Sequence, residues 1–394
     1  MEQFEFFNPV HIYFGQGIRK RLGSTLKRNY KKVLVVCSEG PFHKNGLYDE
    51  ICTDLTRNGL HFFAMEDIAS NPKLASTRRG TQICIENDVD CIVALGGGST
   101  MDCAKTIGAA AKMRIDPYDL IWGKRITPQG SIDTVMIPTL AATGSEANPS
   151  AVIVNDETSE KYFFRSVHPV MAFMDPEILR SVPYRLAVWG AMDILSHTFE
   201  YYFNGNENSE FQKRYSEAII FATMHAVEML NRDPHDINAC GELMWCATSA
   251  WGIGLNGIGR GDPDMGCHGI EESFSGYFDT HHGACLAVLT PRWMELVYQS
   301  NAAIFARFGR VIFGISEKDD LCAAKLGIEK HKSWMKSIGA PNTYFDIGSL
   351  PFSDEKLLHV AKTACRIYNG GVGRIKRLDE TEVFNLLKAG KVSY

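Results

Sequence analysis

Short apolar runs alternate with longer segments of helical pattern over the first half of the chain. The runs have the length of buried strands and fall at residues 33–37, 91–95, 133–137 and 151–154. Helical segments separate them, as the connections of a parallel sheet require. We therefore predict an α/β domain with a parallel sheet over residues 1–183.

Beyond residue 183 the pattern is almost entirely helical. Segments of helical length and spacing cover residues 186–203, 209–231, 239–254, 292–312, 318–338 and 354–368. Two prolines, Pro176 and Pro183, interrupt the pattern where the apolar runs end. We place the domain boundary there and expect an all-helical domain over residues 184–394.

A glycine-rich turn follows one of the predicted strands. Gly96–Gly98 come directly after the run 91–95, Ser99 is expected to cap the next helix, and the helical pattern begins at Met101. A helix N-terminus at such a turn presents free backbone N–H groups and the positive end of the helix dipole, where a pyrophosphate binds well. An ordinary strand-to-helix turn is the alternative, but it rarely needs three glycines. The spacing differs from the dinucleotide fingerprint G-x-G-x-x-G.

Four residues have the chemistry of a divalent-metal site. Asp193 and His197 are four positions apart in a segment without proline, so they project from one face of a helix. His268 and His282 add two imidazoles downstream. Three imidazoles and one carboxylate suit Fe(II), Zn(II) or Co(II) and leave a coordination position for substrate. A solvated helix pair is the alternative for Asp193 and His197 alone.

Composition narrows the class of protein. The chain has 394 residues, 45% of them hydrophobic, and a net charge of −5, which is typical of a globular protein and disfavours strong nucleic-acid binding. It has neither an apolar run of about eighteen residues nor an N-terminal signal pattern. Its eleven scattered cysteines form no C-x-x-C pair. We expect a cytoplasmic enzyme without nucleic-acid or membrane partners.

Together these motifs resemble the iron-containing alcohol dehydrogenases, and within them the butanol-dehydrogenase or aldehyde-reductase branch. The likeness rests on the glycine loop with Asp102 and Lys105, on Pro138–Glu146 and on the Asp/His/His/His set. Three segments support the branch: 255–259, 279–287 and 291–294. The resemblance covers nearly the whole chain. It implies a dehydroquinate synthase-like nucleotide-binding domain, a helical metal-binding domain, and a cofactor and metal in the cleft between them.

The resemblance also implies roles for individual residues. Four match the family's metal ligands: Asp193, His197, His268 and His282. Four match contacts to the pyrophosphate and the nicotinamide side of the cofactor: Gly97, Gly98, Ser99 and Asp102. Three match positions beside the cofactor: Thr139, Thr143 and Lys161.

The proton carrier departs from the family pattern. Relatives often have a histidine four residues after the third metal ligand, and it has been assigned a part in proton transfer; this chain has Glu272 there. A glutamate with a raised pKa can relay a proton, and a salt-bridged structural glutamate is the alternative. His281, directly before the fourth ligand, is a second candidate relay, unless its ring faces away from the metal.

Cofactor choice depends on the end of the first predicted strand. Ser38 stands where NAD-selective relatives carry an aspartate that repels a 2′-phosphate. Serine admits this phosphate, whereas the neighbouring Glu39 disfavours it if the side chain points inward. The sequence therefore leaves both NAD and NADP open.

We predict a metal-dependent, NAD(P)-linked alcohol dehydrogenase or aldehyde reductase that uses Fe²⁺ or Zn²⁺ and moves hydride between the nicotinamide and a small alcohol or aldehyde. The alternatives are a dehydroquinate synthase-like lyase, a polyol dehydrogenase relative and a non-catalytic nucleotide- or metal-binding homologue. A homodimer is expected, because residues 10–14 have the pattern of a strand that pairs across a two-fold axis; a sheet edge within one chain would look the same.

Overall fold

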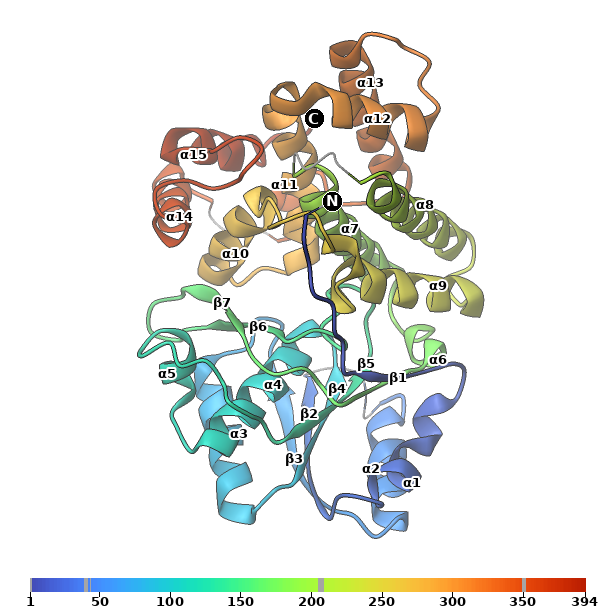
Figure 1. The fold of residues 1–394 in the computed structure, drawn as a ribbon, viewed down its shortest axis with the longest axis vertical. Coiled ribbons are helices and arrows are strands. Elements are labelled where there is room, and N and C mark those ends of the chain that lie inside the picture. Colours follow the sequence, from blue (N-terminus) through green and yellow to red (C-terminus); the bar gives the residue numbers. More distant parts are fainter. Residues whose placement is uncertain (1, 39–41, 43, 205–208, 349–351) are drawn as a thin grey trace. The chain divides into compact units, whose positions relative to one another are not determined.

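The computed structural model describes residues 2–38, 42, 44–204, 209–348 and 352–394 (Figure 1). Residues pack into two compact units. The α/β unit comprises Phe7–Val182 and His235–Thr248, and the helical unit comprises Met1–Phe6, Pro183–Pro234 and Ser249–Tyr394. The predicted domains, residues 1–183 and 184–394, stay a proposal. Residues 235–248 fall within the second predicted domain but pack with the α/β unit.

A six-stranded parallel sheet forms the centre of the α/β unit, in the order β1-β8-β5-β4-β2-β3. The strands are β1 (His11–Phe14), β2 (Lys32–Ser38), β3 (His61–Ile68), β4 (Cys91–Gly96), β5 (Asp133–Pro138) and β8 (Met171–Met174). Every residue of β4 is buried. Strands buried on both faces read as continuous apolar runs, and this explains why the sequence predicts β2, β4 and β5 correctly.

Helices cover both faces of this sheet (Figure 1). Those of the α/β unit are α1 (Leu22–Leu26), α2 (Leu47–Arg57), α3 (Leu74–Asn87), α4 (Gly98–Met113), α5 (Pro117–Ile121), α6 (Pro176–Leu179) and α9 (Ile237–Ala247). Apolar side chains of α1 and α2 form one core cluster with alternate residues of β2, β4 and β5. The predicted α/β architecture with a parallel sheet is confirmed.

The predicted strand at residues 151–154 is real but lies in a different sheet. It forms β6 (Ser150–Val154), which pairs antiparallel with β7 (Lys161–Arg165). Its assignment to the parallel sheet is therefore wrong, because the short turn between β6 and β7 permits only an antiparallel pair. Two strands of the parallel sheet escaped prediction, since β3 is an edge strand with only two buried residues and β8 has only four residues.

The helical unit is built from eight α-helices in the described part of the chain. They are α7 (Tyr184–Tyr202), α8 (Glu210–Arg232), α10 (Gly266–Phe278), α11 (His282–Val297), α12 (Ala302–Phe313), α13 (Asp320–Ser337), α14 (Asp354–Ile367) and α15 (Glu380–Ala389). From Ala187 to Glu200 every residue of α7 is buried, so other elements surround this helix. The predicted helical character is confirmed. No helix among the described residues is long and apolar enough to cross a membrane.

Candidate metal and nucleotide sites

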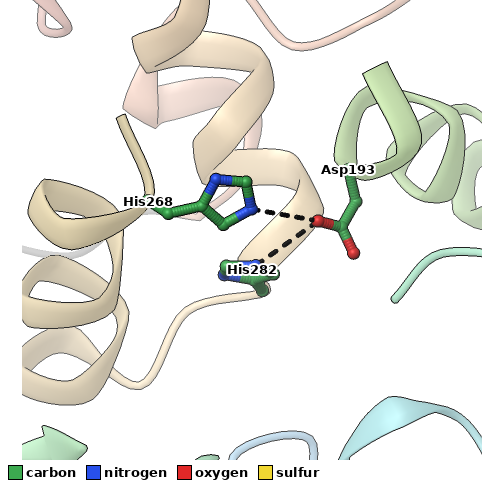
Figure 2. Close-up of side chains that lie close together, drawn as sticks. All are labelled: Asp193, His268 and His282. Atoms are coloured by element: carbon green, nitrogen blue, oxygen red, sulfur yellow. Dashed lines mark ion pairs between the residues drawn. The ribbon is translucent and has the colours of Figure 1, made fainter. Parts of the chain in front are cut away.

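Three of the four predicted metal ligands form one cluster in the helical unit (Figure 2). Oδ1 of Asp193 lies 3.6 Å from Nε2 of His268 and 3.5 Å from Nε2 of His282. One potential ligand atom of each residue lies within 4.8 Å of the others. Asp193 comes from α7, His268 from the first turn of α10, and His282 is the first residue of α11. Three helices thus bring together residues far apart in sequence.

The predicted fourth ligand lies next to this cluster. Nδ1 of His197 is 3.1 Å from Oδ1 of Asp193, one helical turn earlier on α7. The His197 ring packs against the rings of His268 and Trp251, with centroids 4.4 and 5.0 Å away. His197 is not among the three residues whose ligand atoms converge. Its role as a ligand stays a prediction.

The donor atoms of the cluster fit a divalent metal. Within the described part of the chain, Oδ1 of Asp193 and Nε2 of His268 are buried and have no hydrogen-bond partner. Leaving such polar atoms unpaired costs about 1–3 kcal/mol each. A bound cation would remove this cost, and a carboxylate with imidazole nitrogens is a donor set that Zn²⁺ and Fe²⁺ accept.

Two further carboxylates contact the far sides of the imidazole rings. Nδ1 of His268 is 2.8 Å from Oε1 of Glu200, and Nδ1 of His282 contacts Oε2 of Glu271. Both glutamates are buried. Sequence reasoning missed them, although Glu200 follows Asp193 by seven residues and Glu271 follows His268 by three. Helical periodicity places each pair on one face, but only the folded chain shows that both glutamates are buried beside the histidines.

The carboxylates favour positive charge at this cluster. Burial alone would lower the pKa of His268, but the neighbouring carboxylates of Asp193 and Glu200 outweigh it and raise this pKa to about 10. Burial also opposes ionisation of Asp193, yet the neighbouring imidazoles hold its pKa well below the usual range. At His197, burial prevails and lowers the pKa, which favours the neutral ring that metals bind.

The two predicted proton relays lie on or directly before the helices that carry His268 and His282. Glu272 is buried on α10, and its Oε2 is 3.4 Å from the Tyr368 hydroxyl. His281 immediately precedes α11, and its ring centroid is 4.6 Å from that of Trp189. Neither belongs to the group of converging ligand atoms. Their part in proton transfer stays a prediction.

Three of the predicted cofactor residues lie at the carboxyl ends of neighbouring strands in the α/β unit. Gly97 directly follows β4, Ser38 ends β2, and Thr139 directly follows β5. The Thr139 N–H donates to the carbonyl oxygen of Gly96 at 3.0 Å. Ligands of open α/β sheets bind outside this edge, so the placement suits a nucleotide.

Helix α4 begins at this edge without a side-chain cap. Gly97 is the N-cap residue, and no side chain accepts a hydrogen bond there. Ser99 lies inside the first turn, and its hydroxyl donates to the carbonyl oxygen of Ser70. The predicted Ser99 cap and helix start at Met101 are therefore wrong, because Gly98 is already helical. An uncapped N-terminus leaves N–H groups for an anion such as pyrophosphate.

The glycines of the turn have different packing. A Cβ atom on Gly98 would lie 2.6 Å from Cγ2 of Thr143, and one on Gly96 would collide with the side chain of Thr100. A Cβ atom on Gly97 would meet only Cβ of Leu140, at 3.8 Å, which is an ordinary contact. Gly96 and Gly98 thus serve close packing, whereas Gly97 has room for a ligand.

The carboxylate of Asp102 is bound by other groups of the α/β unit. Its carboxylate accepts hydrogen bonds from the Ser145 hydroxyl at 2.5 Å and from the Val152 N–H at 3.0 Å. Nζ of the buried Lys105 lies 3.3 Å from it. Asp102 thereby fixes β6 and the segment after β5 against α4. Lys161 is the buried first residue of β7, paired in register with Val154. The cofactor contacts of Asp102 and Lys161 stay predictions.

Ser38 lies beside the glycine turn, since a Cβ atom on Gly96 would be 3.0 Å from the Ser38 Oγ. This position agrees with a part in cofactor selection. Glu39, the residue expected to disfavour NADP, lies outside the described residues.

Both halves of the chain match descriptions of one protein family. "Iron-containing alcohol dehydrogenase" matches residues 9–176, and the C-terminal part of the Fe-containing alcohol dehydrogenase family matches residues 187–390. The chain belongs to the iron-containing alcohol dehydrogenase family.

Individual members of the family are similar over the whole chain. A probable NADH-dependent butanol dehydrogenase 2 of Bacillus subtilis is 34% identical over 99% of this chain and 100% of its own length. NADPH-dependent aldehyde reductase YqhD of Escherichia coli is 28% identical over 88% of this chain and 90% of its own. A crystal structure of NADH-dependent butanol dehydrogenase A from Thermotoga maritima is 33% identical, with a TM-score of 0.92 and coverage of 100% and 99%. The predicted iron-containing alcohol dehydrogenase of the butanol-dehydrogenase branch is confirmed.

Proposed function

We propose that this protein reduces a small aldehyde to the alcohol, or oxidises the alcohol, with NAD(H) or NADP(H) and a bound divalent metal. The observation that carries the proposal is the convergence of His268 Nε2 and His282 Nε2 on the carboxylate of Asp193. Relatives of this chain are named butanol dehydrogenases and an aldehyde reductase, which supports a short-chain aldehyde as the substrate class.

Each unit contributes its own part of the chemistry. When bound, the metal polarises the carbonyl and the nicotinamide supplies hydride. Asp193, His268 and His282, with His197 beside them, would hold the metal. The backbone N–H groups at the start of α4 would bind the cofactor pyrophosphate, with Thr139, Thr143 and Lys161 beside the cofactor.

Reduction of an aldehyde also consumes a proton at the carbonyl oxygen. We assign its delivery to Glu272 or His281. The buried Glu272 has the Tyr368 hydroxyl within 3.4 Å, and this phenol is a possible second member of the relay. The hydride and the proton together convert the aldehyde into the alcohol and leave the oxidised nicotinamide.

The remaining assignments follow from the same features. The metal is Fe²⁺ or Zn²⁺, and Ser38 admits NADP as well as NAD. The protein is a homodimer, because β1 ends the sheet and offers an edge that a second copy can extend. None of the eleven cysteines, all of which lie among the described residues, forms a disulfide, which supports a cytoplasmic location.

The direct test is oxidation of NADH and NADPH in the presence of butyraldehyde. The protein is stripped of metal with a chelator and then supplied separately with Fe(II), Zn(II) or Co(II). Turnover that depends on added metal supports the proposal, and the better of the two nucleotides settles the cofactor. Binding of metal and nucleotide without turnover of any alcohol or aldehyde in a substrate panel would contradict it and favour a dehydroquinate synthase-like lyase.

A further inference from the structure

We infer that Glu200 and Glu271 are positioning residues of the metal site, whose carboxylates hold the Nδ1–H groups of His268 and His282 so that both Nε2 atoms face Asp193. The inference rests on the proposed metal site and concerns residues outside the predicted ligand set. It explains why two buried glutamates of the helical unit each contact the ring nitrogen of a histidine that faces away from Asp193.

Glu200 couples the start of α10 to the ligand that this helix carries. Its Oε2 accepts the backbone N–H of Met265 at 2.5 Å, and its Oε1 accepts the N–H of His268 at 3.2 Å. The same Oε1 lies 2.8 Å from Nδ1 of His268. A carboxylate at a helix N-terminus stabilises the first turn, so Glu200 fixes both the backbone and the ring of His268.

Glu271 connects two neighbouring helices. It lies three residues after His268 on α10 and contacts Nδ1 of His282 at the start of α11. The start of α11 is itself tightly placed against α7, because a Cβ atom on Gly283 would collide with the carbonyl oxygen of Trp189. The backbone thus fixes the position of His282, and Glu271 fixes the rotation of its ring.

The hydrogen bonds select one imidazole tautomer. When Nδ1 carries the hydrogen and donates it to a carboxylate, Nε2 keeps its lone pair for the metal. Such a carboxylate also makes the ring a more basic ligand. With Asp193, the two glutamates oppose the two positive charges of a metal with three negative ones. We therefore expect tight binding of a dication and a moderate Lewis acid.

The test compares Co(II) affinity in four forms of the full-length protein: wild type, Glu200→Gln, Glu271→Gln and Glu217→Gln. Glutamine keeps the shape of glutamate but removes its charge. Glu217 is the matched control, since it is also a buried glutamate of the helical unit, bonded to Tyr202 and Arg307 rather than to a histidine. Removing a carboxylate behind a metal-bound histidine typically weakens metal binding about 10- to 100-fold.

We expect the Co(II) Kd to rise by that factor in Glu200→Gln and Glu271→Gln, with a changed visible spectrum of the bound Co(II). Glu217→Gln should leave Kd within about 2-fold, whatever it does to the metal-free melting temperature. Glu271→Asp, which keeps the charge, should recover part of the affinity lost in Glu271→Gln. If Glu200→Gln fails to fold because α10 loses its cap, Glu271→Gln carries the comparison.

Two contrary outcomes are distinguishable. Wild-type Co(II) binding with unchanged Kd in both glutamine variants would overturn the positioning role and leave the metal site standing. Failure of the wild type to bind Co(II) would overturn the proposed metal-dependent function and this inference with it.

Discussion

Nε2 of His282 lies 3.5 Å from Oδ1 of Asp193, although the two residues belong to different helices. Neither side chain is exposed enough for this approach to be a surface ion pair, since their exposed fractions are 23% and 2%. The carboxylate of Asp193 lies near one ring nitrogen of His282, and the carboxylate of Glu271 contacts the other. An imidazole with carboxylates on both sides is typical of a histidine that binds a metal beside an acidic ligand.

Replacing Asp193 with asparagine should remove the metal while preserving the fold. Asparagine has the same shape, but it lacks the charge that attracts a dication. We expect metal affinity and aldehyde reduction each to fall by at least about 100-fold, with an unchanged circular dichroism spectrum. Metal analysis of the purified variant checks this, and full metal content with normal turnover would disprove the role of Asp193.

The two central glycines of the nucleotide turn should respond differently to alanine. Gly97→Ala creates only an ordinary contact with Leu140, so the melting temperature without cofactor should hardly change. The added methyl group nevertheless occupies the space assigned to the pyrophosphate, and we expect NADH affinity to fall by at least about 10-fold.

Gly98→Ala is the comparison variant, because its methyl group must displace Thr143. This variant should lose stability as well as affinity. Calorimetric NADH binding and thermal unfolding measure both quantities. Unchanged NADH affinity in Gly97→Ala would place the pyrophosphate elsewhere.

Ser38→Asp should turn the cofactor preference toward NADH. A carboxylate at the end of β2 repels the 2′-phosphate of NADPH but accepts hydrogen bonds from the ribose of NADH. We expect the ratio of KM for NADPH to KM for NADH to rise by at least about 10-fold. Ser38→Asn has the same size without the charge and serves as the control. An equal effect of both variants would indicate steric disturbance instead of charge.

The sequence predicts the central strands well because a strand buried on both faces has a continuous run of apolar residues. Val33–Val36 in β2 and Ile92–Leu95 in β4 are fully buried apolar runs. The edge strand β3 carries polar residues toward solvent and lacks that signal. The pattern of β6 predicts a strand correctly, but periodicity does not determine which strand will be its partner.

At the metal site, the sequence shows which residues can bind a metal, but it does not show which side chains lie close together. Asp193 and the histidines stand out because they are potential ligands with suitable spacing. Glu200 and Glu271 do not, since most glutamates on helices face water and burial appears only in the folded chain. The hydrogen bonds from Ser145 and Val152 to Asp102 likewise depend on tertiary contacts.

His331 should make stability depend on pH independently of the metal site. It is buried on α13 among aromatic rings, and burial lowers its pKa from 6.5 to about 3. Between these values the unfolded chain binds a proton that the folded protein does not, so stability is complete above about 6.5 and falls as the pH drops. The slope approaches about 1.4 kcal/mol per pH unit for one proton.

His331→Phe should therefore reduce the loss of melting temperature between pH 7 and pH 5. The exposed His225→Gln serves as the control, because its removal takes away a histidine without changing the core. The comparison uses the difference from wild type at each pH, which removes contributions from other groups. An identical pH slope in wild type and His331→Phe would show that His331 titrates alike in the folded and unfolded chains, which would contradict this prediction.

The most direct test of the account is a titration of metal-free protein with Co(II) in which the visible spectrum and the rate of NADH or NADPH oxidation by butyraldehyde are followed together. We predict that both signals rise in parallel and stop at about one Co(II) per chain, and that Asp193→Asn shows neither. Turnover by the metal-free protein, or a spectrum that saturates without any turnover of the aldehyde, would contradict a metal-dependent hydride transfer at Asp193, His268 and His282.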